Sequence, residues 1–92
     1  MAKRILKFEL SVTDEQQVVM PAGAQILTAQ FQFGVLQLWA ICDEAVLPRY
    51  GRVPRRIVIY DADAWLPEDP GKYINTVRQE NGMLVWHIFE KE

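Results

Sequence analysis

Four arginines lie within eight residues near the middle of the chain, Arg49, Arg52, Arg55 and Arg56, and Tyr50 stands among them. A guanidinium group presents planar N–H forks that match phosphate and carboxylate oxygens, and an aromatic ring beside it offers a face on which a base can stack. This cluster therefore predicts a contact with an anionic small ligand such as a nucleotide, or with an acidic protein surface.

A second interpretation of the arginine cluster needs no ligand. The segment from Asp61 to Asp69 is acidic, and exposed arginines on a solvated loop commonly pair with nearby carboxylates. The chain has 10 Lys and Arg against 12 Asp and Glu, a formal net charge of −2. That balance gives no general attraction to nucleic acid or to acidic membranes, so we expect neither as a partner.

Residues able to do covalent chemistry are few, because the chain has one histidine, His87, and one cysteine, Cys42. A Cys–His pair can act as nucleophile and base, but Cys42 ends an apolar run, where a free cysteine behaves as a small hydrophobe. The sequence contains neither a Gly-x-Ser-x-Gly nor a His-Glu-x-x-His pattern. We therefore expect a protein that binds rather than an enzyme.

Acidic residues offer the only candidate metal ligands. Asp61 and Asp63 are two residues apart and could donate oxygens together with Glu68 or Asp69. The spacing of a calcium-binding loop is missing, and a zinc site would need more sulfur and imidazole than the chain has. We expect a solvated acidic loop here, with no metal and no cofactor.

Three further side chains are candidates for contact with a ligand or partner. Trp65 stands in the acidic, proline-containing loop, where it either projects as an interface anchor or folds back to cap the open end of the sheets. Arg78 and His87 are expected on one half-exposed face of the C-terminal hairpin. His87 there either binds a ligand or forms a hydrogen bond on the sheet face.

Composition indicates one small domain over residues 1–92. Half of the residues are apolar or aromatic, which suits a packed core. A single cysteine cannot form an intramolecular disulfide, and no apolar stretch approaches the roughly 18 residues that span a bilayer. The N-terminal residues do not show the pattern of a secretory signal. We expect a cytoplasmic protein.

Apolar and polar residues alternate along much of the chain, which is the period of a strand with one face in water. The run from Val35 to Cys42 is nearly all apolar, as in a central strand covered on both faces. No segment shows the spacing of a substantial helix, although a short turn of helix is expected at 44–47. The expected strands are 4–12, 17–20, 24–33, 35–42, 55–62 and two in a C-terminal hairpin. This pattern predicts an all-β fold, a small antiparallel sandwich or barrel of about six to seven short strands.

The C-terminal hairpin is predicted by the pair Asn81-Gly82, because both central residues of a type I′ turn need positive φ. If these two residues form the loop, cross-strand partners follow from counting outward. The expected pairs are Val77 with Trp86, Thr76 with His87 and Ile74 with Phe89. The face assigned to the core carries Tyr73, Val77, Leu84, Trp86 and Ile88.

Several segments, in this order along the chain, resemble a family of short uncharacterised bacteriophage and prophage proteins, a domain of unknown function. The matching segments are Arg4–Glu9, Val12–Gln16, Met20–Leu27, Gly34–Ala40, Tyr73–Val77 and Gly82–Glu90. Where such proteins have a glycine-rich turn after the arginine-bearing strand, this chain reads Tyr60–Pro67. The resemblance implies a phage or prophage origin, hence the cytoplasm of a host cell, and it implies no catalytic residues.

These observations together predict a phage-type, non-enzymatic accessory protein. It would bind an anionic, nucleotide-like ligand or an acidic host protein through Arg55, Arg56 and nearby aromatic side chains. The alternative is a structural or scaffolding protein in virion assembly. An unpaired edge strand such as Gln17–Met20 could join two copies, so a homo-oligomer is expected.

Overall fold

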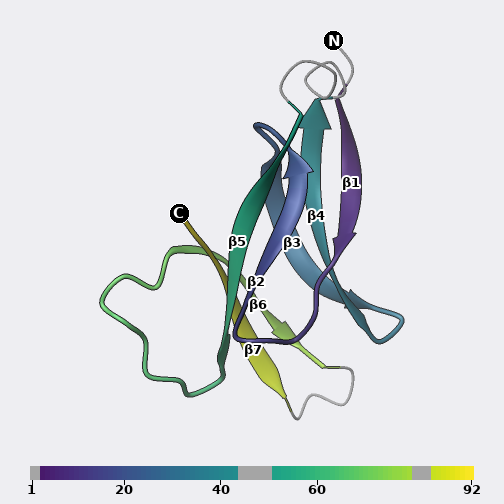
Figure 1. Cartoon of the computed structure of the whole chain (residues 1–92). Coiled ribbons are helices and arrows are strands. Elements are labelled where there is room, and N and C mark those ends of the chain that lie inside the picture. The colour runs from purple at the N-terminus through teal and green to yellow at the C-terminus, as the bar shows by residue number, and fades with distance from the viewer. Residues whose placement is uncertain (1–2, 44–50, 80–83) are drawn as a thin grey trace.

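The computed structural model describes residues 3–43, 51–79 and 84–92, which form seven strands. The strands are β1 (Lys3–Glu9), β2 (Glu15–Pro21), β3 (Gln25–Gln32), β4 (Val35–Asp43), β5 (Arg52–Asp61), β6 (Lys72–Arg78) and β7 (Val85–Lys91). They form a three-stranded sheet, β1-β4-β3, and a four-stranded sheet, β2-β5-β7-β6 (Figure 1), and every pairing is antiparallel. The all-β fold is confirmed as a sandwich, and the two sheets do not close into a barrel. Within the described ranges there is no helix, hence none able to cross a membrane.

The hydrophobic core lies between the two sheets. The central strand β4 turns Leu36, Leu38 and Ala40 inward, and all three are buried. From the other sheet, buried side chains include Ile57 of β5 and Ile88 of β7. Burying one such aliphatic side chain contributes about 1.5–3 kcal/mol, so this layer supplies the main driving force for packing the sheets together.

Two β-bulges shift the alternation of side chains. One lies in β3 between Ile26 and Thr28, and the other in β6 between Tyr73 and Asn75. A bulge inserts one extra residue, so side chains before and after it change faces relative to a regular strand. The bulge explains why Ile26, out of phase in a regular alternation, packs against the core.

The C-terminal hairpin has the predicted pairing close to its turn and a different pairing farther away. Thr76 pairs with His87 and Val77 with Trp86, as expected. The expected pair of Ile74 with Phe89 is wrong, because the bulge places Tyr73 opposite Phe89. Asn81 and Gly82 lie outside the described residues.

Two side chains expected in the core of this hairpin are exposed. Tyr73 is 55% exposed because the bulge turns it to the outer face, and Leu84 is exposed just before β7 begins. The other three side chains that the sequence assigns to this core face are found there, since Val77 and Ile88 are buried and Trp86 packs against the core.

The two bulges meet at one corner of the sandwich, where Asn75 joins the sheets. The Ala29 N–H donates to Asn75 Oδ1 at 2.9 Å, and Asn75 Nδ2 donates to the Ala29 carbonyl at 2.7 Å. The side-chain amide of Asn75 thus replaces a neighbouring strand for one residue of β3. This contact satisfies backbone groups at the edge of β3 that no strand of its own sheet pairs.

Strand β5 begins earlier than the sequence predicts. Its first residue is Arg52 rather than Arg55, and it includes Pro54, for which the sequence predicts an irregular segment. Pro54 is tolerated because it pairs only with Val19 of β2, in a part of β5 that has no β7 neighbour. The short helical turn expected at 44–47 lies outside the described residues.

Candidate functional site

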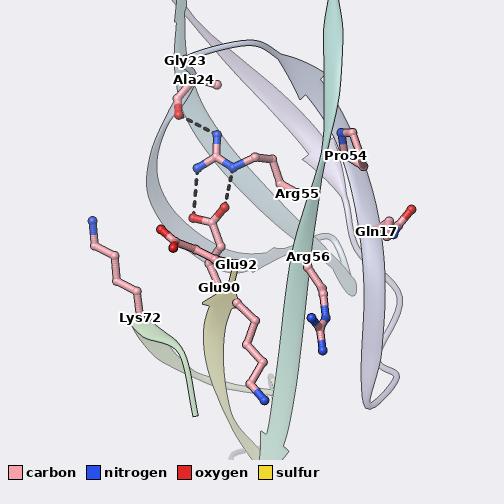
Figure 2. A pocket seen from close by; sticks show the side chains of 10 residues that line it. Gln17, Gly23, Ala24, Pro54, Arg55, Arg56, Lys72, Glu90 and Glu92 are labelled. Carbon is pink, nitrogen blue, oxygen red and sulfur yellow. Dashed lines mark hydrogen bonds and ion pairs between the residues drawn. The ribbon is translucent and has the colours of Figure 1, made fainter. Parts of the chain in front are cut away.

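A notch opens in the four-stranded sheet where β7 ends. Residues Arg56 to Asp61 of β5 pair with β7, but Arg52 to Arg55 pair only with β2. The notch has a volume of about 630 Å³, within the roughly 300–1,000 Å³ typical of small-molecule sites. Its lining includes the charged side chains of Arg55, Arg56, Lys72, Glu90, Lys91 and Glu92 (Figure 2).

Arg55 spans the inner side of the notch. Its Nε and Nη2 atoms donate to the two carboxylate oxygens of Glu90, the Nη2 bond measuring 2.9 Å. Its Nη1 atom donates to the Ala24 carbonyl at 2.8 Å, just before β3 begins (Figure 2). The side chains of Arg55 and Glu90 are only 21% and 17% exposed. Arg55 therefore connects the ends of β5 and β7 to the other sheet, and most of its N–H groups already have partners.

The ion pair also fixes the charge state of Arg55. The hydrogen bond to Glu90 raises the pKa of the Arg55 guanidinium above its ordinary value, and burial alone would lower it. A bidentate arginine–carboxylate pair is among the stronger polar contacts in proteins. Arg55 is thus a structural cation, neutralised by Glu90.

Arg56 lies on the opposite face of β5 from Arg55, because successive residues of a strand alternate. Its register partner on β7 is Lys91, so these two cations are neighbours on the outer face. Arg56 Nε lies 3.2 Å from Glu15 Oε1 without the alignment of a hydrogen bond, and the Arg56 side chain is 41% exposed. Arg56 therefore keeps N–H groups that a ligand could use.

Lys72 and Lys91 complete a basic rim around the notch. Within the ranges that the structure describes, neither ammonium group has a hydrogen bond or an ion pair. Of the charged lining residues, four are basic and two, Glu90 and Glu92, are acidic. Because Glu90 neutralises Arg55, the other three basic side chains outnumber Glu92. The notch therefore has a net positive charge, although the whole chain has a net charge of −2. We call Arg56, Lys72 and Lys91 the basic rim.

An aromatic strip borders Arg56 and Lys91 on the outer face, whereas Lys72, opposite Glu90 in register, lies on the inner face. Phe89 is two residues before Lys91 on β7 and so lies on the same face, about 7 Å along the strand. Tyr60 and Tyr73 flank it, with ring centroids 5.3 and 5.4 Å from that of Phe89 in edge-to-face geometry. The aromatic strip therefore lies next to the positively charged Lys91 on β7.

A chain of hydrogen bonds surrounds His87 farther along the same face. Its Nε2 atom lies 3.1 Å from the Ala62 carbonyl, which can only accept, so Nε2 carries the proton. Its Nδ1 atom then accepts from the Thr76 hydroxyl at 2.8 Å, and Thr76 Oγ1 accepts from the Tyr73 hydroxyl at 2.7 Å. Of the two roles expected for His87, this geometry supports hydrogen bonding on the sheet face.

Comparison with known proteins adds a family. A model described as Domain of unknown function (DUF7352) matches residues 1–92. The chain belongs to the DUF7352 family. No curated protein and no solved structure matches it. The description of DUF7352 names no activity, so the chemistry of the site follows from its geometry.

The remaining predicted site residues of this DUF7352 chain are dispersed. Trp65 is 98% exposed, so the expected alternative of folding back over the sheets is wrong. Arg78 is at the far end of β6 from Lys72, about 20 Å along the strand. Arg52 is exposed before the notch, and Arg49 lies outside the described residues.

Other predicted chemistry is not assembled by the DUF7352 fold. Cys42 is buried in the core on β4, and burial raises the pKa of its thiol, whereas His87 faces outward from β7 in the other sheet. They do not form a nucleophile–base pair. Arg55 pairs with Glu90 and Arg56 with Glu15, rather than with the acidic segment 61–69. Among the described residues, no three His, Cys, Asp or Glu side chains are grouped to hold a metal.

Sequence reasoning missed Lys72, Glu90 and Lys91. Strand alternation could have indicated that Arg55 and Arg56 do not belong to one site face, because adjacent residues of a strand point to opposite faces. The position of the notch was not readable, because it depends on where β7 ends relative to β5. The pairing of Arg55 with Glu90 follows from that register.

Proposed function

We propose that this chain is a non-enzymatic binding protein whose notch takes an anionic, nucleotide-like ligand. The observation that carries the proposal is the basic rim, with its adjacent aromatic strip, on an otherwise acidic chain. Lys72 would contact phosphate oxygens from the inner side of the notch, and Lys91 with the outward N–H groups of Arg56 would contact them from the outer face. The exposed ring of Tyr73 offers a stacking surface on the same face.

The geometry revises the role that the sequence suggests for Arg55. Its guanidinium is held by Glu90 and Ala24, so it shapes the wall of the notch, and the ligand would contact Arg56 instead. The resemblance to phage and prophage proteins supports the further proposal that the chain is an accessory protein acting in a host cell. Genes of host takeover beside its gene would support that origin, and a position in a bacterial metabolic operon would contradict it.

Calorimetric titration with adenosine mono-, di- and triphosphate and with inorganic phosphate tests the ligand. We expect the double variant Lys72→Ala, Lys91→Ala to weaken binding about 100-fold or more, because each of the two lost charged contacts is worth roughly 1.5–3 kcal/mol. The matched control is Lys3→Ala, Lys7→Ala on β1, which removes the same charge from the other sheet. Affinity should also fall with added salt.

Two outcomes would decide against the proposal. If no phosphate compound binds, the nucleotide version is wrong and an acidic host protein is the remaining partner for the basic rim. If a nucleotide binds but the rim variant binds it as tightly as the β1 control does, the ligand occupies another surface.

A further inference from the structure

The connection between β5 and β6, residues 62–71, projects from the sandwich as a long loop (Figure 1). We call it the arm. Trp65 near its middle is 98% exposed, and Leu66 beside it is exposed as well. Single exposed aliphatic residues are ordinary, but tryptophan carries a large apolar area and is enriched among residues that dominate binding energy. The arm therefore presents an anchor that its own molecule does not bury.

The arm is held in place at both ends. The Ala62 carbonyl accepts a hydrogen bond from His87, and the Tyr60 hydroxyl donates to the Pro70 carbonyl at 3.2 Å. At Gly71, φ is +99°, and a Cβ atom would lie 2.6 Å from the Glu90 carbonyl oxygen, so the backbone packs closely against β7 there. An arm ordered before association loses little conformational entropy on binding.

Charge on the arm is opposite to charge on the neighbouring face. Asp63, Glu68 and Asp69 lie in the arm, which has no basic side chain. The basic rim lies on the same sheet, and Asp69 of the arm borders a hollow that Arg56 and Lys91 also line. A surface that carries an acidic arm beside a basic rim is complementary to a second copy of itself.

A small apolar hollow lies beneath the arm. It has a volume of about 220 Å³, and its lining includes Leu66 of the arm with His87 and Phe89 of β7. This volume is below the roughly 300–1,000 Å³ of drug-sized ligand sites, so the hollow suits one side chain rather than a whole ligand. It is continuous with the aromatic strip, which ends at the basic rim.

We propose that two copies of this chain associate through the arms as a two-fold symmetric dimer. Trp65 of each copy enters the hollow of the other, and the arm carboxylates lie against the other copy's basic rim. The contact is isologous, so it is made twice and closes at two copies. The arm carboxylates and the proposed ligand would use the same basic rim and so would compete for it, and for this reason the dimer is tested without any ligand present.

Sedimentation velocity over a wide range of protein concentrations tests the anchor. We expect the wild-type chain to form a dimer, and Trp65→Ala to weaken the dimer at least about 30-fold, the effect of losing a hot-spot residue. The matched control is Phe33→Asn, which removes another aromatic side chain, 94% exposed, from the β3–β4 turn. Asn suits that position because φ of Phe33 is +51°. The control should dimerise as the wild type does.

A charge exchange tests the geometry. The arm variant Asp63→Lys, Glu68→Lys and the rim variant Lys72→Glu, Lys91→Glu should each be monomeric alone, because like charges meet in both contacts. Mixed in equal amounts, they should form a heterodimer, since each arm again meets a rim of opposite charge. Native mass spectrometry resolves the two homodimers from the mixed species. Circular dichroism of each variant checks that it is folded.

Three results would overturn the dimer. If the wild-type chain stays monomeric at the highest concentrations, the arm does not join two copies, and its partner is a different protein. Dimerisation of Trp65→Ala as strong as that of the wild type would place the interface elsewhere, for example at an open strand edge such as β2. If the two folded charge variants do not form a mixed dimer, the arm of one copy does not contact the basic rim of the other.

Discussion

Arg55 and Arg56 are adjacent in the chain yet face opposite sides of β5, and their environments differ accordingly. The inward guanidinium bonds Glu90 and the Ala24 carbonyl, joining both sheets. The outward guanidinium is exposed beside Lys91 and only loosely paired with Glu15. A cluster of like residues in a sequence can therefore contain one residue that stabilises the fold and one available for binding.

Substitution of the two arginines should separate these roles. Arg55→Ala should lower the free energy of unfolding by roughly 1.5–3 kcal/mol, because Glu90 is left largely buried without its partner. Arg56→Ala should cost less than about 1 kcal/mol, as expected for an exposed ion pair. Urea denaturation measures both, with the m-value as a check on two-state unfolding. Equal losses in the two variants would contradict the assignment.

Cys42 makes stability depend on pH in the alkaline range. Burial raises the pKa of its thiol, so the folded state keeps the proton at a pH where the unfolded state loses it. Stability is therefore complete below the ordinary thiol pKa of about 8.5 and falls as pH rises toward the folded value. Cys42→Ala should be less stable at pH 7 but lose less stability than the wild type between pH 7.5 and 9.5 in chemical denaturation. A parallel decline in both proteins would show that other groups cause it.

At the scale of elements, the sequence predicts the strands better than it predicts their details. Alternation and the Asn81-Gly82 pair are local signals, and they correctly indicate the seven strands and the pairing of Thr76 with His87. The bulges at Leu27 and Ile74 were not predictable, because neither carries a glycine or another local mark. They are stabilised by the tertiary contact between Asn75 and Ala29. The notch is likewise set by relative strand length.

Asn75 should be important for joining the two sheets. Asn75→Ala removes two hydrogen bonds and leaves the buried Ala29 backbone groups without partners, so we expect a loss of about 1–3 kcal/mol. Hydrogen exchange at the Ala29 amide should become faster by a larger factor than at amides within β4. The control is Gln30→Ala, an exposed neighbour on the same strand, which should change little. Unchanged protection of Ala29 in Asn75→Ala would rule out the bridging role.

At the scale of the whole molecule, a domain of 92 residues buries a modest core, and association is one way to add stability. A dimer formed only by folded chains shifts unfolding by mass action. The melting temperature of the wild type should thus rise with protein concentration, whereas that of Trp65→Ala should not. Differential scanning calorimetry at several concentrations measures both. A wild-type melting temperature independent of concentration would argue against association of the folded chain.

The opposite orientations of Arg55 and Arg56 also bear on which mutations a gene for this fold can accept. Inserting a single codon just ahead of Arg55, with the earlier residues of β5 keeping their register with β2, would move every later side chain of the strand to the opposite face. Glu90 would then face the inserted residue in place of Arg55, and the charged side chain of Arg56 would enter the buried position of Ile57. Changes in the length of this strand should therefore be rare during evolution.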